Sequence, residues 1–280
     1  MSTRDILVPE NLHYIDYSIT MDDVKYALER GETLTARVVH LNAHNYNIIV
    51  AITDKIFAKL PWEEATIYPF SKSHASQKVP NQIIAIKGKK IRVRVTKIAT
   101  DGTIYVSRRA VMQDSWHDIV FAPLNYAFTA QITGFDSTDS GIFYDIGGGV
   151  IAFCHILEFS TTIVDLPEFC KAGDIHKVSL LGLSDIPKMK LSCSRKLAEP
   201  KKRYSDYHRF QMVKVKISSP IYDCNNNYIN GYRVEVNPLV HGILDVVQGE
   251  EYKCGTEVWA CIKKIKPQVD KMTLEVPKTK

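Results

Sequence analysis

Long apolar segments are missing from this sequence. No uninterrupted apolar run reaches roughly 18 residues, the length that an α-helix needs to cross a lipid bilayer. The first residues, MSTRDILVPENLHYIDYS, contain acids and a proline but no apolar core, so we expect no secretory signal. These two absences predict a protein without a membrane partner.

Motifs of metal sites and enzymes are missing as well. The six cysteines form no C-x-x-C pair, which disfavours a zinc site, and their scatter favours reduced thiols in the cytoplasm. The catalytic motifs G-x-S-x-G, H-E-x-x-H and G-x-x-x-x-G-K-(S/T) do not occur. Gly147-Gly148-Gly149 joins two predicted strands and precedes no helix, so it indicates a flexible hairpin rather than a phosphate loop. We therefore expect no enzyme, no metal and no cofactor.

Positive charge is unevenly distributed along the chain. The net charge of +5 is modest, but residues 87–97 hold six basic residues and no acid. Residues 195–209 hold six basic residues against Glu199 and Asp206. Such runs are commonly solvated faces of strands or helices. An electropositive groove for the phosphates of a nucleic acid is the alternative.

A short pattern occurs three times. Residues 88–110 read GKKIRVRVTKIATDGTIYVSRRA, residues 172–197 read AGDIHKVSLLGLSDIPKMKLSCSRKL, and residues 254–276 read CGTEVWACIKKIKPQVDKMTLEV. Each copy has an early glycine, an alternating strand, a turn and a closing strand, and the copies lie roughly 80–90 residues apart. The repeat predicts a tandem array of small β-modules.

The order of these elements resembles the S-one RNA-binding module, the repeat unit of small-subunit ribosomal protein S-one. In the middle module, GIFY at residues 141–144 is similar to the family's GAFV element, and AFCHI at residues 152–156 is similar to its GLVHIS element. Leu191-Ser192 resembles the closing strand. Ser140 stands where the family usually has phenylalanine, so the resemblance implies that one stacking side chain is missing.

The two outer modules match less completely. The first resembles the family at VSRR, residues 106–109, and at AKLP, residues 58–61. In the third, GYRV at residues 231–234 and GIL at residues 242–244 fit loosely, and no histidine stands at the VHIS position. The resemblance covers about residues 33–277.

The resemblance implies an all-β fold of three tandem five-stranded OB-fold barrels of the S-one type, joined by short helical linkers. An N-terminal extension holds a short helix and is otherwise poorly structured or edge-like. The predicted boundaries are 1–33 for this extension, 34–112 for the first module, 113–125 for a linker helix, 126–197 for the second module, 198–209 for a linker and 210–277 for the degenerate third module.

Local signals add detail to this plan. Thr20 is expected to cap a helix that stops at Gly31. A second helix is expected over residues 110–122, and a third over residues 158–169 within the second module. Asn230-Gly231 predicts a hairpin turn in the third module.

Candidate binding residues gather in the middle module. Single-strand binding requires aromatic faces for bases and cations for phosphates. Phe153 and His155 are two residues apart on one predicted strand, so they point to the same face. The resemblance places further contacts at Phe143, Asp185 and Lys188. The alternatives are core packing for Phe143, a structural role for His155 and a turn cap for Asp185.

The first module offers mainly charge. The resemblance places Tyr46 at the approximate aromatic position, and Arg92, Arg94 and Arg108 supply cations. Strand alternation puts Arg92 and Arg94 on one face, opposite apolar neighbours, and predicts that both are exposed. In the third module, Arg233 replaces the aromatic residue.

The resemblance implies a single-stranded RNA-binding protein, similar to a short ribosomal protein S-one, that holds mRNA in translation through stacking and phosphate contacts. The expected partners are single-stranded RNA and the ribosome. The middle module is expected to be the main nucleotide-reading unit. The alternative is a protein-interaction scaffold that docks a ribosome, a polymerase or an RNA-processing complex, which the degenerate third module favours for part of the chain.

Overall fold

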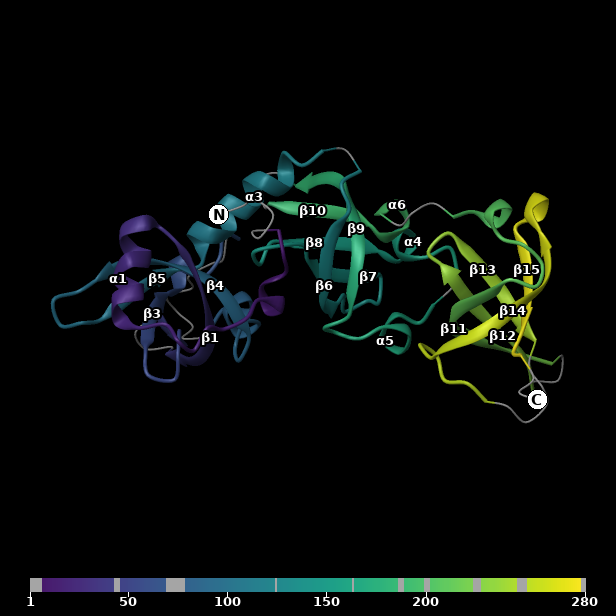
Figure 1. Ribbon diagram of the computed structural model, residues 1–280, viewed down its shortest axis with the longest axis horizontal. Coiled ribbons are helices and arrows are strands. Elements are labelled where there is room, and N and C mark those ends of the chain that lie inside the picture. Colours follow the sequence, from purple (N-terminus) through teal and green to yellow (C-terminus); the bar gives the residue numbers. More distant parts are fainter. Residues whose placement is uncertain are drawn as a thin grey trace. The chain divides into compact units, whose positions relative to one another are not determined.

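Three closed five-stranded barrels follow one another along the chain (Figure 1). In each barrel the strands pair in the order first, second, third, fifth and fourth, and the third and fifth strands are parallel. This is the Greek-key order of the OB-fold, so the predicted all-β class with three such barrels is confirmed. The computed structural model describes residues 7–42, 46–68, 79–123, 125–162, 164–185, 189–198, 202–223, 228–245 and 251–277.

The first barrel has an aliphatic core. Its strands are β1 (Thr33–Asn42), β2 (Asn47–Ala51), β3 (Phe57–Pro61), β4 (Lys90–Ile98) and β5 (Ile104–Ser107). Val38, Val50 and Leu60 lose essentially all solvent contact, and their strand neighbours point outward. Short helices η3 (Trp62–Glu64) and α2 (Asn81–Ile84) lie between β3 and β4. The alternating side chains of the sequence therefore decide which face of each strand enters the core.

Two helices flank the first barrel where the sequence predicts them. Helix α1 (Met21–Arg30) begins with a capping box: the Thr20 hydroxyl accepts from the Asp23 N–H, and the Asp23 carboxylate accepts from the Thr20 N–H. Gly31 ends the helix with a φ of 65°, which glycine adopts without steric cost. Helix α3 (Arg109–Val120) follows β5 directly.

The N-terminal segment is more ordered than expected. A 3₁₀ turn, η2 (Glu10–Leu12), contacts β4, and Glu10 is only 4 % exposed. The expectation of a poorly structured or edge-like segment is therefore wrong for its described part, because buried hydrogen bonds hold Glu10 against the first barrel.

The second barrel carries two short helices in place of the expected single one. Its strands are β6 (Phe128–Phe135), β7 (Gly141–Asp145), β8 (Ile151–His155), β9 (Ile175–Asp185) and β10 (Lys190–Ser194). Helices α4 (Ile156–Phe159) and α5 (Leu166–Phe169) lie between β8 and β9, and the Asp165 side chain caps α5. The predicted helix over residues 158–169 is thus interrupted. Cys154 and Cys193 are fully buried, as expected for small core residues.

The third barrel follows helix α6 (Arg195–Ala198) and the 3₁₀ turn η4 (Tyr204–Asp206). Its strands are β11 (Met212–Tyr222), β12 (Ile229–Asn237), β13 (Val240–Asp245), β14 (Glu257–Lys266) and β15 (Lys271–Glu275), with η5 (Pro267–Val269) before the last. Asn230 and Gly231 lie inside β12, where Gly231 pairs with Ile221. The predicted Asn-Gly hairpin turn is therefore wrong: the chain reverses earlier, between β11 and β12.

Compactness divides the chain into two units. One holds residues 1–123 with residues 145–151 and 184–190, and the other holds residues 124–144, 152–183 and 191–280. The β7–β8 loop thus belongs to the first unit. None of the helices in the described ranges has the length and apolar character that crossing a bilayer requires.

Candidate nucleic-acid interface

Three aromatic side chains form a row on the outside of the second barrel. Phe143 lies between the fully buried Ile142 and Tyr144, so its ring points outward and is half-buried. Its ring centroid lies 5.2 Å from that of Phe153, and the Phe153 centroid lies 6.5 Å from that of His155. The structure thus brings together the three aromatic residues named from the sequence, across β7 and β8. We call Phe143, Phe153 and His155 the aromatic row.

Gly141 makes room for this row. A Cβ atom at Gly141 would lie 2.5 Å from Cζ of Phe153 and would also collide with the carbonyl oxygen of Cys154. The Phe153 ring therefore lies over the β7 backbone at a point where any other residue would displace it. This steric conflict explains why the GIFY element begins with a glycine.

His155 is the exposed member of the row. Its Nδ1 accepts a hydrogen bond from the Leu157 N–H at 3.2 Å, which caps α4. In the neutral imidazole this bond leaves the proton on Nε2, where it can be donated to an external acceptor. The structural role and the contact role proposed for His155 are therefore compatible.

Ser140 belongs to a polar turn beside the row. Its hydroxyl donates to the Asp136 carboxylate at 2.9 Å, and hydrogen bonds from Thr138 and Ser140 lower the pKa of Asp136. The serine that replaces the family's phenylalanine thus stabilises the β6–β7 turn. The Asp185 side chain and Lys188 lie outside the described residues.

The first barrel has its own outward aromatic residue, which sequence reasoning missed. Phe57 on β3 is 50 % exposed and pairs with Ala51 of β2. The next pair on the same outward side of the two strands is Ile49 with Lys59. The alternation in FAKLP could have found it, because Ala58 and Leu60 are core residues and Phe57 must point away from them.

Tyr46 directly precedes β2. Its ring is 45 % exposed and meets the buried Trp62 ring edge-on at 5.0 Å. Its φ of 51° is uncommon for a residue other than glycine, so this conformation carries strain.

Arg92 and Arg94, both predicted to be exposed on β4, are less exposed than expected. Arg92 is only 8 % exposed; its backbone N–H donates to Glu10 at 3.0 Å, and its Nη1 lies 2.8 Å from Nδ1 of His13. The prediction that both strand arginines are exposed is wrong for Arg92, because the N-terminal segment covers this part of β4. Arg94 is half-buried and pairs with Asp114 at 2.7 Å.

Arg108 is committed to a buried ion pair. Its guanidinium donates to both carboxylate oxygens of Glu10 and to the Ala65 carbonyl, and its side chain is 7 % exposed. In this arrangement Arg108 positions the N-terminal segment, and a phosphate would have to displace Glu10 to reach it.

A second carboxylate lies beside this pair. Asp145 accepts from the Glu10 N–H at 2.8 Å and from the N–H groups of Gly147 and Gly149. Burial, followed by the nearby Glu10 charge, raises the pKa of Asp145 to about 7, although Arg108 and these hydrogen bonds oppose the rise. The glycines of the β7–β8 loop form the expected hairpin, but hydrogen bonds hold it in place.

The second basic run also contains a structural arginine. Arg195 pairs with Glu235 at 2.8 Å, and its guanidinium lies 4.6 Å from the centre of the Phe159 ring. The Ser160 hydroxyl donates to the same glutamate. This arginine therefore joins α6 to β12 within the second unit.

The face of the third barrel that corresponds to the aromatic row is different. Tyr232 is a core residue, 1 % exposed, and Arg233 points outward opposite the half-exposed Ile243. On the described strands β12 and β13, the only aromatic ring on the outward side is that of His241, which is half-buried against the Tyr204 ring.

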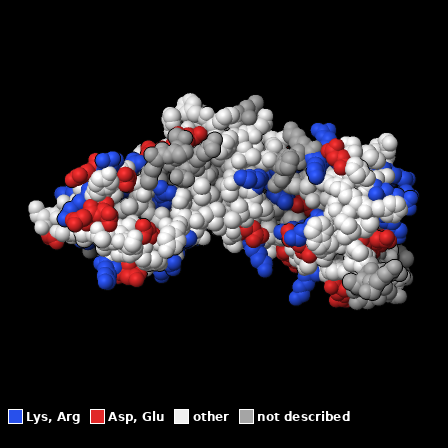
Figure 2. Space-filling model, viewed as in Figure 1, with Lys and Arg blue, Asp and Glu red and all other residues white. Residues whose placement is uncertain are grey.

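Charge is distributed very differently over the three predicted modules. Residues 34–112 hold 13 basic and 4 acidic residues, a net charge of +9. Residues 126–197 hold 6 basic and 8 acidic residues, a net charge of −2, and residues 210–277 hold 8 basic and 8 acidic residues, a net charge of zero. In the view of Figure 2, charged side chains are frequent over the first and third barrels, whereas the surface over β6–β10 is mostly uncharged. The module with the aromatic row is thus not the module with the positive charge.

Comparisons with known proteins add little. No family model and no curated protein matches the sequence. Among solved structures, a multidomain protein with nucleic acid binding domains from Streptococcus pneumoniae TIGR4 aligns with 89 % of this chain and 74 % of its own, at 13 % identity and a TM-score of 0.31. A similarity this low carries no argument about function.

Proposed function

We propose that this chain is a single-stranded RNA-binding protein of the S-one type rather than an enzyme. The observation that carries the proposal is the aromatic row on the outer face of β7 and β8. In OB-fold barrels this face is the usual place for single strands, and aromatic rings there stack on bases. Following the resemblance to ribosomal protein S-one, the RNA is mRNA, and the protein acts in translation in the cytoplasm with the ribosome as a partner.

The uneven charge suggests that the first and second modules contribute different interactions with RNA. The first module, with its net charge of +9, attracts the phosphate backbone, and exposed Lys87, Lys89 and Lys97 lie on or next to β4. The second module has a net charge of −2 and contributes stacking instead. Both modules lie on one chain, so capture by the first raises the effective RNA concentration at the second.

The test is a titration of single-stranded RNA, duplex RNA and single-stranded DNA against the full chain. Replacing Phe143 by Ala removes a stacking ring worth about 1–3 kcal/mol, so single-stranded RNA should bind roughly 5- to 150-fold more weakly. Phe121→Ala, at a 74 % exposed aromatic residue after α3, is the matched control and should change nothing. Thermal melting must show an intact fold, because a buried phenylalanine would instead lose about 3–5 kcal/mol of stability. Unchanged folding and affinity in Phe143→Ala would refute the proposal.

A further inference from the structure

A second exposed surface lies on the third barrel, away from its β12–β13 face. Strands β11 and β14 pair antiparallel, with Met212 opposite Cys261, Lys214 opposite Trp259 and Lys216 opposite Glu257. The residues between them, such as Val213, Val215 and Ala260, are buried in the core. The six paired residues therefore point outward, and we call them the β11–β14 face.

Trp259 is the most informative residue of this face. Its side chain is 59 % exposed, whereas Trp62 is 3 % exposed and Trp116 is half-buried. Neighbouring Met212 is 45 % exposed, which extends the apolar surface along β11. An exposed indole is a large flat ring on which a base can stack.

Phe210 adds a second ring at the end of the face. It precedes β11, donates its N–H to the Ile262 carbonyl at 2.7 Å, and is 69 % exposed. Its φ of 70° lies in the left-handed region, where a residue other than glycine is strained. The fold therefore holds a large apolar ring in solvent at a conformational cost. Such strain often accompanies function.

Cations accompany both rings. The Arg209 guanidinium lies 4.6 Å from the centre of the Phe210 ring, and Lys214 is the cross-strand partner of Trp259. The face itself holds two cations, Lys214 and Lys216, against one acid, Glu257. Glu257 pairs with Lys214 at 2.5 Å, and the Lys216 ammonium lies 4.5 Å from the centre of the Phe169 ring. Lys263, further along β14 and outside the face, pairs with Asp245 and Glu275.

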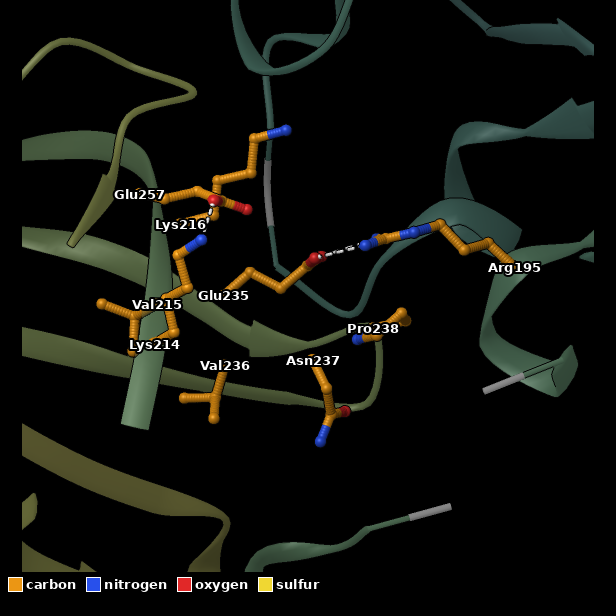
Figure 3. Close-up of a pocket in the computed structure, with 9 residues that line it drawn as sticks. All are labelled: Arg195, Lys214, Val215, Lys216, Glu235, Val236, Asn237, Pro238 and Glu257. Carbon is orange, nitrogen blue, oxygen red and sulfur yellow. Dashed lines mark hydrogen bonds and ion pairs between the residues drawn. The ribbon is translucent and has the colours of Figure 1, made fainter. Parts of the chain in front are cut away.

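A polar pocket of about 220 Å³ opens beside the face. Lys214, Lys216 and Glu257 contribute to its lining, and Figure 3 shows the Lys214–Glu257 ion pair together with the buried Arg195–Glu235 pair. Five of the nine lining residues are charged, and Val215, Val236 and Pro238 are apolar. The charged groups suit a phosphate or ribose better than an apolar side chain.

We infer that the β11–β14 face, with Phe210 at its end, is a second single-stranded RNA site that stacks bases on Trp259 and Phe210. The inference rests on the proposed function and extends it to the module whose described β12–β13 face has no outward phenylalanine, tyrosine or tryptophan. RNA is favoured over a protein partner because the two rings have cations beside them and the face carries a net positive charge.

The experiment uses the full chain and a uridylate oligonucleotide of about 30 nucleotides, enough to span three OB-folds at about 4–16 nucleotides each. Trp259→Ala should weaken binding roughly 5- to 150-fold, while Trp259→Phe, which keeps a ring, should retain most of the affinity. Phe210→Gly removes the second ring and relieves the strained φ, so it should weaken binding without lowering the melting temperature. Phe121→Ala is again the matched control.

The outcomes separate the two proposals. Weaker binding in Trp259→Ala and Phe210→Gly with unchanged melting temperatures supports the second site. Unchanged affinity in both, while Phe143→Ala binds more weakly, overturns the second site and leaves the proposed function intact. Absence of RNA binding by the wild-type chain overturns both. Unchanged RNA affinity with loss of self-association in sedimentation would assign the face to protein contact and likewise overturn the inference.

Discussion

The guanidinium of Arg108 forms a bidentate ion pair with the carboxylate of Glu10, although the two residues are 98 positions apart in the sequence. Nε donates to Oε1 at 2.9 Å and Nη2 donates to Oε2 at 2.6 Å, with both side chains buried. This two-bond geometry fixes the N-terminal segment against the end of β5. It also explains why a cation expected to meet RNA does not reach the surface.

Replacing Glu10 by Ala should destabilise the protein by about 3–5 kcal/mol, because it leaves the Arg108 charge buried without its partner. The free energy of unfolding in urea measures this. Asp22→Asn, at an exposed ion pair with Lys25, is the control and should have no measurable effect. Adding Arg108→Met to Glu10→Ala should recover part of the loss. Equal stability of wild type and Glu10→Ala would show that the pair contributes nothing.

Asp145 should make stability depend on pH in an unusual direction. Its folded pKa of about 7 exceeds the value of about 4 for an unfolded aspartate, so between these values the folded state binds the extra proton. The free energy of unfolding should therefore fall as pH rises from about 4 to about 7. Asp145→Asn cannot titrate, and subtracting its unfolding free energy removes the effects of other groups. The unfolding free energy of the wild type minus that of the variant should fall between about pH 4 and pH 7 and stay constant above it. A rise across this range would contradict the raised pKa of Asp145.

The lysines near β4 should control the salt dependence of RNA binding. Lys87, Lys89 and Lys97 are exposed, and each phosphate contact contributes about 0.7 to the slope of log affinity against log salt. Changing all three to Gln should therefore make the slope shallower by about 2, with equal weakening for every RNA sequence. Arg92→Gln, at a buried cation of β4, should lower stability and leave the slope unchanged. An unaltered slope in the triple variant would mean that these lysines face only solvent.

Gly141 should be intolerant of a side chain. Gly141→Ala places a Cβ against Phe153 and the Cys154 carbonyl, so the second barrel should lose about 1–3 kcal/mol of stability and RNA binding should weaken as the row shifts. Gly134→Ala, where nothing lies within 4 Å, is the matched control. Equal melting temperatures for the two variants would argue against the steric role of Gly141.

Local patterns predicted much of this molecule. Strand alternation placed Phe153 and His155 on one outward face, and the capping residues of α1 were identified at both ends. The same alternation could have found Phe57, whose neighbours Ala58 and Leu60 are core residues.

What local patterns missed depends on distant contacts. Arg92 lies on a strand that alternates correctly, yet it is buried because Glu10 and His13 cover it. Asn230-Gly231 has the composition of a turn, but pairing between β11 and β12 extends through it. The importance of Trp259 depends on exposure in the folded barrel, which its alternating strand alone does not specify.

The β7–β8 loop has a practical consequence for dissecting the chain. Asp145 relies on the N–H of Glu10, and the Gly148 N–H donates to the Val8 carbonyl. A fragment that starts at residue 126 would contain the complete aromatic row but would leave this loop without either partner. Weak RNA binding by such an excised barrel would then reflect a collapsed loop rather than a poor site. The contribution of each barrel is better measured by point substitutions in the uncut chain.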